Sequence, residues 1–281
     1  MGLLVWRVGT GPFLHGIRAV DATALLAAFA VGVVVTVGCA WRWSVIAAGL
    51  GVRLPLPEAV GSYYRSQFLN TTLPGGILGD VHRATRHGLA IGDVGLGVRA
   101  AVLDRVAGQA VQIAITVVVL AVFPSPVRPY LPAVAAALVL AGLAAAALVR
   151  ASDNKGGRWA LGDEVRGGLI AHGNWVRVGA ASTLVLAGNA TTFLIAARAA
   201  GVTAPLTVLL PLVFLVLLAT AVPLNVAGWG PREGAAAWAF AATGLSAQWG
   251  LATAVTCGIL VFVASLPGLG VLLHGWLRRP T

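Results

Sequence analysis

The chain has 281 residues, of which 58% are hydrophobic and only 10% are charged, whereas about a quarter of the residues of an ordinary soluble domain are charged. This composition excludes a water-soluble globular protein and predicts an all-α, multi-pass membrane protein. The formal net charge is +10, but the basic residues stand in short segments between apolar runs. That distribution fits the positive-inside rule and argues against a nucleic-acid-binding surface.

Long uncharged stretches indicate the membrane-crossing helices. Each holds roughly the 20 apolar residues that cross a bilayer core. They are residues 22–41, 106–127, 129–149, 178–197, 199–231 and 234–277. We therefore expect a single transmembrane domain over residues 1–281.

The first predicted span covers residues 19–41 and ends at the segment 41–43, whose aromatic and cationic side chains are typical of a cytoplasmic membrane interface. A helix over 58–72 follows, and at about 1.5 Å per residue it is too short to cross the bilayer core. Residues 73–76, with the sequence LPGG, end it, because proline disfavours helix in the preceding residue and glycine relaxes the backbone. The sequence thus predicts a helix that enters the membrane and returns.

Two aspartates mark the starts of the next helices. Asp80 stands where the N-cap of a short helix is expected, and Gly88 where that helix would end. Asp93 is the expected N-cap of a long helix that reaches Phe123.

One face of this long helix is polar. It consists of Arg105, Gln109, Gln112 and Thr116. Their spacing places them in one stripe, which we expect to contact protein or water instead of lipid. For the two glutamines, a transport role and a hydrogen-bonded seam between helices remain alternatives. For Arg105 we favour a functional role.

The second half of the chain follows a connecting span at residues 131–149. Residues 150–177 form the longest polar segment and carry five basic residues, so they should be cytoplasmic. The next span, 178–197, has a second polar face, made of Ser182, Asn189 and Thr192. A second interrupted segment, 205–243, and a final span that ends near Trp276 complete the chain.

The two interrupted segments have related breaks. Pro74 precedes Gly79 by five residues, and Pro223 precedes Gly228 by the same number. Interrupted segments at corresponding positions of two halves are typical of transporters with inverted repeats.

We predict such an inverted repeat, with repeat one at about 20–123 and repeat two at about 178–277. Each repeat consists of a span, a re-entrant hairpin and a span, and the connecting span turns the second copy over. The hairpin at 56–88 should enter from the cytoplasm and the hairpin at 205–243 from outside, so that the breaks meet near the middle of the membrane. The turns at 124–130 and 198–204 are then outside, and the C-terminus is cytoplasmic.

The breaks carry the residues that we expect to bind a substrate. Glycines there would leave backbone N–H groups accessible at the positive ends of two short helices, which suits an anion. These glycines are Gly75, Gly76, Gly79, Gly228 and Gly230. Guanidinium donors for a lipid phosphate would come from Arg83, Arg105 and Arg232.

Three carboxylates accompany the arginines: Asp80, Asp104 and Glu233. They would pair with the arginines or bind an amine of the substrate. The alternative is that the charged residues form ion pairs that only hold the hairpins in place.

Neither a metal site nor a cofactor is expected. His82 and His87 are five residues apart, not the four that place two ligands on one helical face. Cys39 and Cys257 both lie inside apolar spans, which indicates neither a disulfide framework nor a metal cluster. A phosphate-binding G-x-x-x-x-G-K-[ST] loop is absent from the sequence.

The motifs at the breaks resemble those of a flippase-like membrane family that includes the transmembrane region of lysylphosphatidylglycerol synthases. They are FLNTTLPGGILGDVHR at 68–83, the pair Asp104 and Arg105, and GWGPRE at 228–233. The resemblance covers roughly residues 20–275 and implies translocation of a lipid head group between leaflets. The matched charged positions are Asp80, Arg83, Arg105, Arg232 and Glu233.

The chain departs from the family pattern in two places. Family members usually have another helix before the first span, whereas the first span here begins near residue 19. The last span commonly carries an arginine, whereas residues 234–277 hold no charge. Without a soluble aminoacyl-transferase domain, the chain is not expected to synthesise the lipid itself.

Together these features predict a transporter, not an enzyme, that moves an anionic or zwitterionic phospholipid or a polyprenyl-phosphate-linked sugar across a bacterial plasma membrane. One alternative is a membrane-embedded transferase that uses Asp80 or Glu233 as a base. The other is a non-catalytic membrane partner of a glycosyltransferase.

Overall fold

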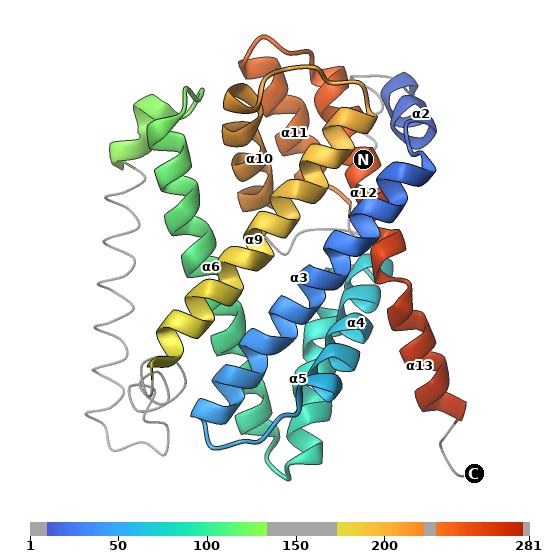
Figure 1. Cartoon of the computed structure of the whole chain (residues 1–281), viewed down its shortest axis with the longest axis vertical. Coiled ribbons are helices and arrows are strands. Elements are labelled where there is room, and N and C mark those ends of the chain that lie inside the picture. The colour runs from blue at the N-terminus through green and yellow to red at the C-terminus, as the bar shows by residue number, and fades with distance from the viewer. Residues whose placement is uncertain (1–9, 134–172, 222–228, 278–281) are drawn as a thin grey trace.

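The computed structural model describes residues 10–133, 173–221 and 229–277, and the regular secondary structure in these ranges is entirely helical (Figure 1). Four helical runs in them are long and apolar enough to cross a membrane. They are α3 (Ala22–Gly49), α6 (Val94–Val122), α9 (Asn174–Ala199) and the continuous run of α12 (Ala247–Ser265) and α13 (Pro267–Leu277). The all-α, multi-pass class predicted from the sequence is therefore confirmed.

Some predicted features lie outside the described residues. These include nearly all of the connecting span at 131–149 and of the polar segment at 150–177. Pro223 and Gly228 of the second break are also outside.

Helix α3 extends past its predicted end. Its N-cap is Asp21, which accepts a hydrogen bond from the Ala24 N–H at 2.6 Å, and it continues to Gly49, before Gly51 at a φ of 81°. Residues 44–48 hold neither proline nor glycine, so the chain stays helical through and beyond the segment predicted to lie at the interface. Arg42 and Trp43 are consequently buried inside the protein, and their predicted role as an interfacial anchor is wrong.

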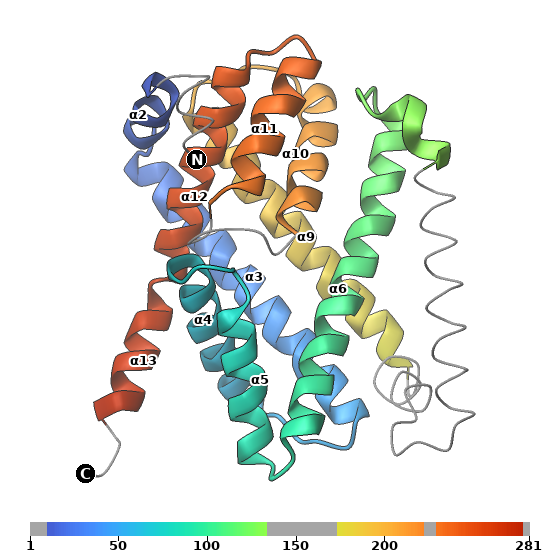
Figure 2. The same cartoon turned by 180° about the vertical axis from the view of Figure 1, so that it is seen from behind.

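Two helical hairpins lie between the long helices. The first pairs α4 (Leu56–Thr72) with α5 (Leu78–Ala90), and the second pairs α10 (Leu206–Thr220) with α11 (Pro231–Ala242). With 17 and 15 residues, α4 and α10 are about 25 Å and 22 Å long, which is shorter than a hydrocarbon core of about 30 Å. The hairpins occupy opposite ends of the long axis, and α4 and α10 both end near its middle (Figure 2).

At the first break, the preceding helix ends where it was predicted to end, but the following helix begins at a different residue. Helix α4 ends at Thr72, and Gly75 and Gly76 adopt positive φ values of 93° and 61°. Helix α5 begins at Leu78, so Asp80 lies in its first turn and is not the predicted N-cap. The reason is that Asn70 caps this helix from the neighbouring one: its Oδ1 accepts the Gly79 N–H at 2.8 Å.

The end of α5 also differs from the prediction. Gly88 lies inside the helix, which continues to Ala90 and is followed by Gly92 at a φ of 75°. Asp93 caps α6 as predicted, because its carboxylate accepts the Leu96 N–H at 2.9 Å.

The long helices end at the two ends of the long axis of the molecule (Figure 1). Helices α6 and α9 finish at the same end of the long axis, and this end also holds α2 (Gly11–Arg18), a short helix that the sequence did not predict (Figure 1). The short 3-10 helix η1 (Arg128–Tyr130) lies in the turn after α6. Helix α13 finishes at the opposite end of the long axis, the end at which α9 begins, although the two lie on different sides of the molecule (Figure 1).

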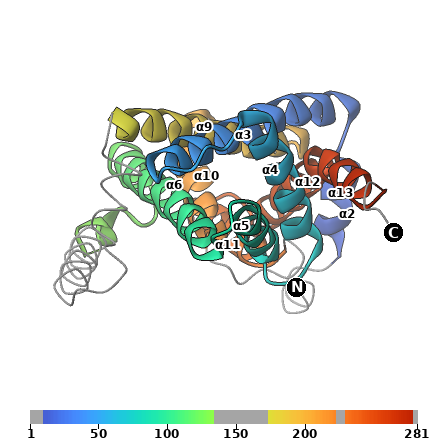
Figure 3. The same ribbon diagram turned by 90° about the horizontal axis from the view of Figure 1, so that it is seen from below.

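Helices α3 and α9 run side by side along one edge of the bundle, opposite α5, α6 and α11 (Figure 3). Small residues allow this approach: a Cβ on Gly38 of α3 would lie 3.1 Å from Val185 Cγ2 of α9. The main apolar core joins α9, α10, α11 and α12 through Phe193, Leu212, Phe240 and Leu260. The polar side chains gather elsewhere, in the space enclosed by α3, α4, α5, α6 and α9.

The crossing of α5 and α6 depends on Gly97. A Cβ at this position would lie 2.6 Å from the Ala84 carbonyl oxygen and 2.5 Å from the Gly88 nitrogen, both backbone atoms. We expect Gly97→Ala to destabilise the protein by about 1–3 kcal/mol through overpacking. The control is Gly179→Ala on α9, where a Cβ meets nothing within 4 Å. Thermal unfolding in detergent should show a lower Tm only for Gly97→Ala; equal Tm values would contradict this packing.

Candidate functional site

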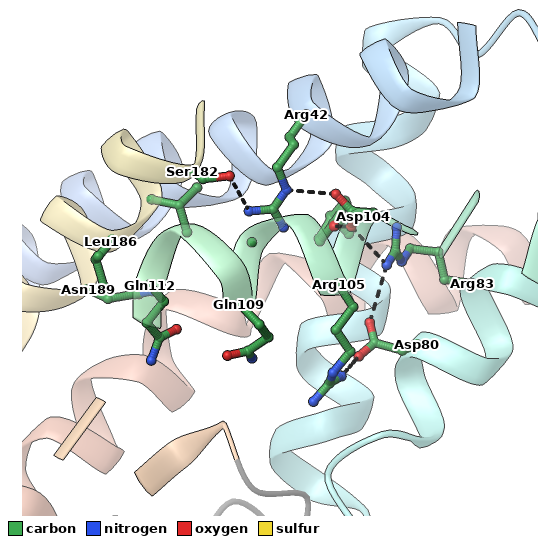
Figure 4. A pocket seen from close by; sticks show the side chains of 13 residues that line it. Arg42, Asp80, Arg83, Asp104, Arg105, Gln109, Gln112, Ser182, Leu186 and Asn189 are labelled. Carbon is green, nitrogen blue, oxygen red and sulfur yellow. Dashed lines mark hydrogen bonds and ion pairs between the residues drawn. The ribbon is translucent and has the colours of Figure 1, made fainter. Parts of the chain in front are cut away.

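Asp104 of α6 is the centre of a buried network of charges. Its Oδ1 accepts a hydrogen bond from Arg42 Nε of α3 at 2.8 Å. Its Oδ2 accepts from the Tyr63 hydroxyl of α4 and from Arg83 Nη2 of α5, the latter at 3.3 Å. Asp104 is 1% exposed, so one carboxylate joins four helices inside the protein (Figure 4).

Two features of the neighbouring helices make room for this network. A Cβ on Gly108 of α6 would lie 2.6 Å from Arg42 Nη1, so the guanidinium in its present position needs a glycine there. The same Nη1 donates to Ser182 Oγ of α9 at 3.3 Å. The polar face of α9 therefore contacts the network.

The Arg83 guanidinium lies between two aromatic rings. Its central carbon is 4.3 Å from the ring centroid of Trp43 and 4.2 Å from that of Tyr63. Its Nε and Nη1 are buried and have no hydrogen-bond partner among the described residues. Cation–π contacts thus stabilise the part of this cation that no oxygen contacts.

Asp80 of α5 forms a second and more open centre. Its Oδ2 pairs with Arg105 Nη1 and accepts from Asn70 Nδ2, and its Oδ1 accepts from Ser66 Oγ at 3.0 Å. Arg83 Nη2 is 3.5 Å from the same Oδ1 and links the two centres. The Arg105 side chain is 39% exposed, whereas the Arg83 side chain is 3% exposed.

These residues line a pocket of about 190 Å³, which we call the charged pocket (Figure 4). Its charged residues are Arg42, Asp80, Arg83, Asp104 and Arg105. Three guanidinium groups against two carboxylates leave this set with a formal charge of +1. The remaining polar wall comes from α6 and α9, with Gln109, Gln112, Ser182 and Asn189.

The polar faces predicted on α6 and α9 therefore point into the protein and meet in the charged pocket. Gln112 also donates through Nε2 to the Leu217 carbonyl of α10 at 2.8 Å, which makes it an interhelical contact. Thr116 is buried one turn further along α6. Gln109 forms no hydrogen bond to another described residue, and its amide points into the pocket (Figure 4).

The second break has its own ion pair. Arg232 Nε and Nη2 both donate to Glu233 Oε1, at 2.9 and 2.8 Å, and Glu233 is fully buried. Glu233 Oε2 accepts the Gly230 N–H at 2.6 Å and so caps α11. Within the described ranges, no ion pair connects Arg232 or Glu233 to the charged pocket.

Two of the backbone N–H groups expected to bind an anion are already occupied. The Gly79 N–H donates to Asn70, and the Gly230 N–H donates to Glu233. The expectation that these groups are accessible is wrong, because a neighbouring side chain caps each short helix. Gly75 and Gly76 lie in the loop between α4 and α5, and Gly228 lies outside the described residues.

The structure thus brings together four of the predicted residues: Asp80, Arg83, Asp104 and Arg105. It adds two that the sequence did not single out for a site, Arg42 and Tyr63. The sequence around Arg42 does indicate a functional residue, since Arg42 is a lone charge with apolar residues continuing on both sides. Tyr63 precedes Ser66, Gln67 and Asn70 on the same helix, at the spacing of one polar face.

A buried network of charged residues among helices that are long and apolar enough to cross a membrane, beside a helical hairpin, defines a multi-pass membrane protein with a buried polar site. The family described as the lysylphosphatidylglycerol synthase transmembrane region matches residues 1–268, and the chain belongs to this family. The family resemblance predicted from the motifs is confirmed, and it relates the protein to others that modify or handle membrane lipids. Among curated proteins and among solved structures, no match is found.

Proposed function

We propose that this protein moves a phosphate-bearing lipid, a phospholipid or a polyprenyl-phosphate-linked sugar, between the leaflets of a bacterial plasma membrane. The observation that carries the proposal is the position of Arg105. Its side chain lines the charged pocket, is 39% exposed and is held by Asp80 at Nη1. Its other N–H groups can donate to a phosphate, for which the planar guanidinium is suited.

The surrounding charge favours an anion in the same place. The charged residues of the pocket carry a formal +1, and both carboxylates are already bound by guanidinium groups. A low-dielectric environment strengthens the attraction of such a site for a phosphate. Binding to it would compensate for the removal of the phosphate from water.

The two hairpins provide a route for movement. We infer that α4–α5 and α10–α11 are re-entrant hairpins of an inverted repeat, because their first helices are short and they lie at opposite ends of the long axis (Figure 2). Inverted repeats permit alternating access to a site near the middle of the membrane. The charged pocket lies beside the inner end of the first hairpin, where such a site is expected.

The orientation follows from the arginines. We propose that the C-terminus and residues 150–177 are cytoplasmic and that the turns at 124–130 and 198–204 face outside. Helices α6 and α9 both finish at the end assigned to the outside, and α13 finishes at the other (Figure 1).

Transport is favoured over lipid modification by the state of the carboxylates. A general base must lie within hydrogen-bond reach of the substrate proton. Glu233 is fully buried and bound by Arg232 and Gly230. Asp80 is bound by Arg105, Ser66 and Asn70, so both proposed bases have their oxygens engaged.

We expect Arg105→Ala to slow the transfer of tail-labelled fluorescent phosphatidylglycerol in proteoliposomes by roughly ten- to a hundredfold, because a hydrogen bond to a charged group contributes about 1.5–3 kcal/mol. Stability should change by about 1 kcal/mol or less, since this ion pair is partly exposed. Transfer is measured by quenching of the outer leaflet with dithionite.

The matched control is Arg177→Ala, which removes an exposed arginine at the start of α9. It should leave the transfer rate unchanged. Equal rates for wild type and Arg105→Ala would contradict the proposal. Release of a chemically modified lipid by the wild type would favour the transferase, and absence of both activities would favour the non-catalytic partner.

A further inference from the structure

A second pocket adjoins the charged pocket, and Asn189 of α9 lines both. It has a volume of about 200 Å³, and none of the residues that line it is charged, so we call it the neutral pocket. Its polar lining consists of Gln67, Asn70, Thr71, Asn189, Thr192 and Ser265. The rest of its wall is formed by small apolar residues of α3 and α12, such as Ala28 and Ala264.

The neutral pocket is suited to hydroxyl groups. A water molecule occupies about 30 Å³ of liquid, so the pocket has room for a chemical group of several atoms. Amides and hydroxyls both donate and accept hydrogen bonds, as the hydroxyls of a polyol do. Gln67 accepts from Thr36 at Oε1, which leaves its Nε2 as a donor, and Asn189 has no hydrogen bond to another described residue.

Neither pocket offers a free group that would bind an ammonium head group: the neutral pocket has no charged residue, and the carboxylates of the charged pocket are already paired. Asp104 is bound by Arg42, Arg83 and Tyr63, and Asp80 by Arg105. The rings of Trp43 and Tyr63, which might otherwise form cation–π contacts with an amine, contact the Arg83 guanidinium. A cationic head group in the neutral pocket would also be repelled by the net positive charge of the adjoining charged pocket.

We propose that the neutral pocket binds an uncharged, polyhydroxylated head group, glycerol or a sugar, of a lipid whose phosphate lies in the charged pocket. Lipids with ammonium head groups are discriminated against. This inference rests on the proposed function and selects among its substrates. Asn189, at the junction of the pockets, is the residue that contacts the hydroxyl group closest to the phosphate.

Transfer of three tail-labelled lipids in proteoliposomes tests this selectivity. The wild type should move phosphatidylglycerol or phosphatidylinositol roughly five- to tenfold faster than phosphatidylethanolamine, since one or two hydrogen bonds of about 1 kcal/mol each distinguish them. A faster rate for phosphatidylglycerol identifies a glycerol site, and a faster rate for phosphatidylinositol identifies a site of sugar size.

Substitutions at Asn189 give the sharper readout. Asn189→Leu should abolish the preference, and Asn189→Asp should shift it toward phosphatidylethanolamine by supplying a carboxylate. Gln67→Leu is a second variant with the same expected loss of preference. Thr191→Val, on the exposed side of the same helix, is the control and should leave the preference unchanged.

The outcomes separate this inference from the proposed function. If the wild type moves all three lipids at equal rates, or if Asn189→Leu keeps the wild-type preference, the polyol site is wrong while lipid transport stands. If the wild type moves none of the three, the proposal that it transports phospholipids fails, and the polyol site fails with it.

Discussion

Asp104→Ala is expected to lower the free energy of unfolding by about 3–5 kcal/mol, because it leaves the buried Arg42 without a carboxylate and Arg83 with only its longer contact to Asp80. Asp104 is 1% exposed and pairs with Arg42 at 2.8 Å and with Arg83 at 3.3 Å. Arg42 keeps only Ser182, and the loss of the Tyr63 hydrogen bond adds to the cost. The four helices that meet at this carboxylate should separate more easily.

Thermal unfolding in detergent, followed by tryptophan fluorescence, measures this effect. Asp93→Ala is the matched control, because Asp93 is an N-cap on α6 that is exposed and contributes about 1 kcal/mol. If Asp104→Ala yields too little folded protein, Asp104→Asn retains the shape of the side chain and should still unfold well below the wild type. A loss no greater than that of Asp93→Ala would show that the network does not hold the helices together.

Arg232→Ala is also expected to lower the free energy of unfolding by about 3–5 kcal/mol, because it leaves the fully buried Glu233 without its cation. Both hydrogen bonds from Arg232 go to Glu233 Oε1. Arg232→Lys should restore only part of the stability, since an ammonium group cannot place two donors as the guanidinium does.

The double variant Arg232→Ala with Glu233→Ala separates a structural role from a role in transport. It removes both charges and should recover part of the lost stability, although the Gly230 N–H then loses its cap. Thermal unfolding and lipid transfer are measured on the same preparations. Recovery of both properties would assign Arg232 to structure alone, whereas recovered stability without transfer would support a role for Arg232 with lipid phosphate.

Local signals predicted the helices well. The break at residues 73–76 and the cap at Asp93 depend on proline, glycine and aspartate chemistry that acts over a few residues, and both are present in the structure. The start of α5 differs from the prediction because its cap, Asn70, lies on a different helix. Helix α3 extends past its predicted end because Arg42, a charge that the pattern places at the membrane surface, is buried against Asp104.

The partners of the charged residues could not be read from the sequence. Asp104 and Arg105 are neighbours in the chain, yet Asp104 joins Arg42 and Arg83 while Arg105 joins Asp80. A helix turns by about 100° per residue, so adjacent side chains point to different neighbours. The neutral pocket could not be predicted from the sequence either, because its residues come from α3, α4, α9 and α12 and carry no charge.

The central claim is that the charged pocket holds the phosphate of a membrane lipid, and native mass spectrometry of the purified protein tests it most directly. After extensive exchange into detergent, the wild type and the control Arg177→Ala should retain a phosphate-bearing lipid, and Arg105→Ala should lose it. Wild-type protein without such a lipid, or equal retention by Arg105→Ala, would contradict the claim.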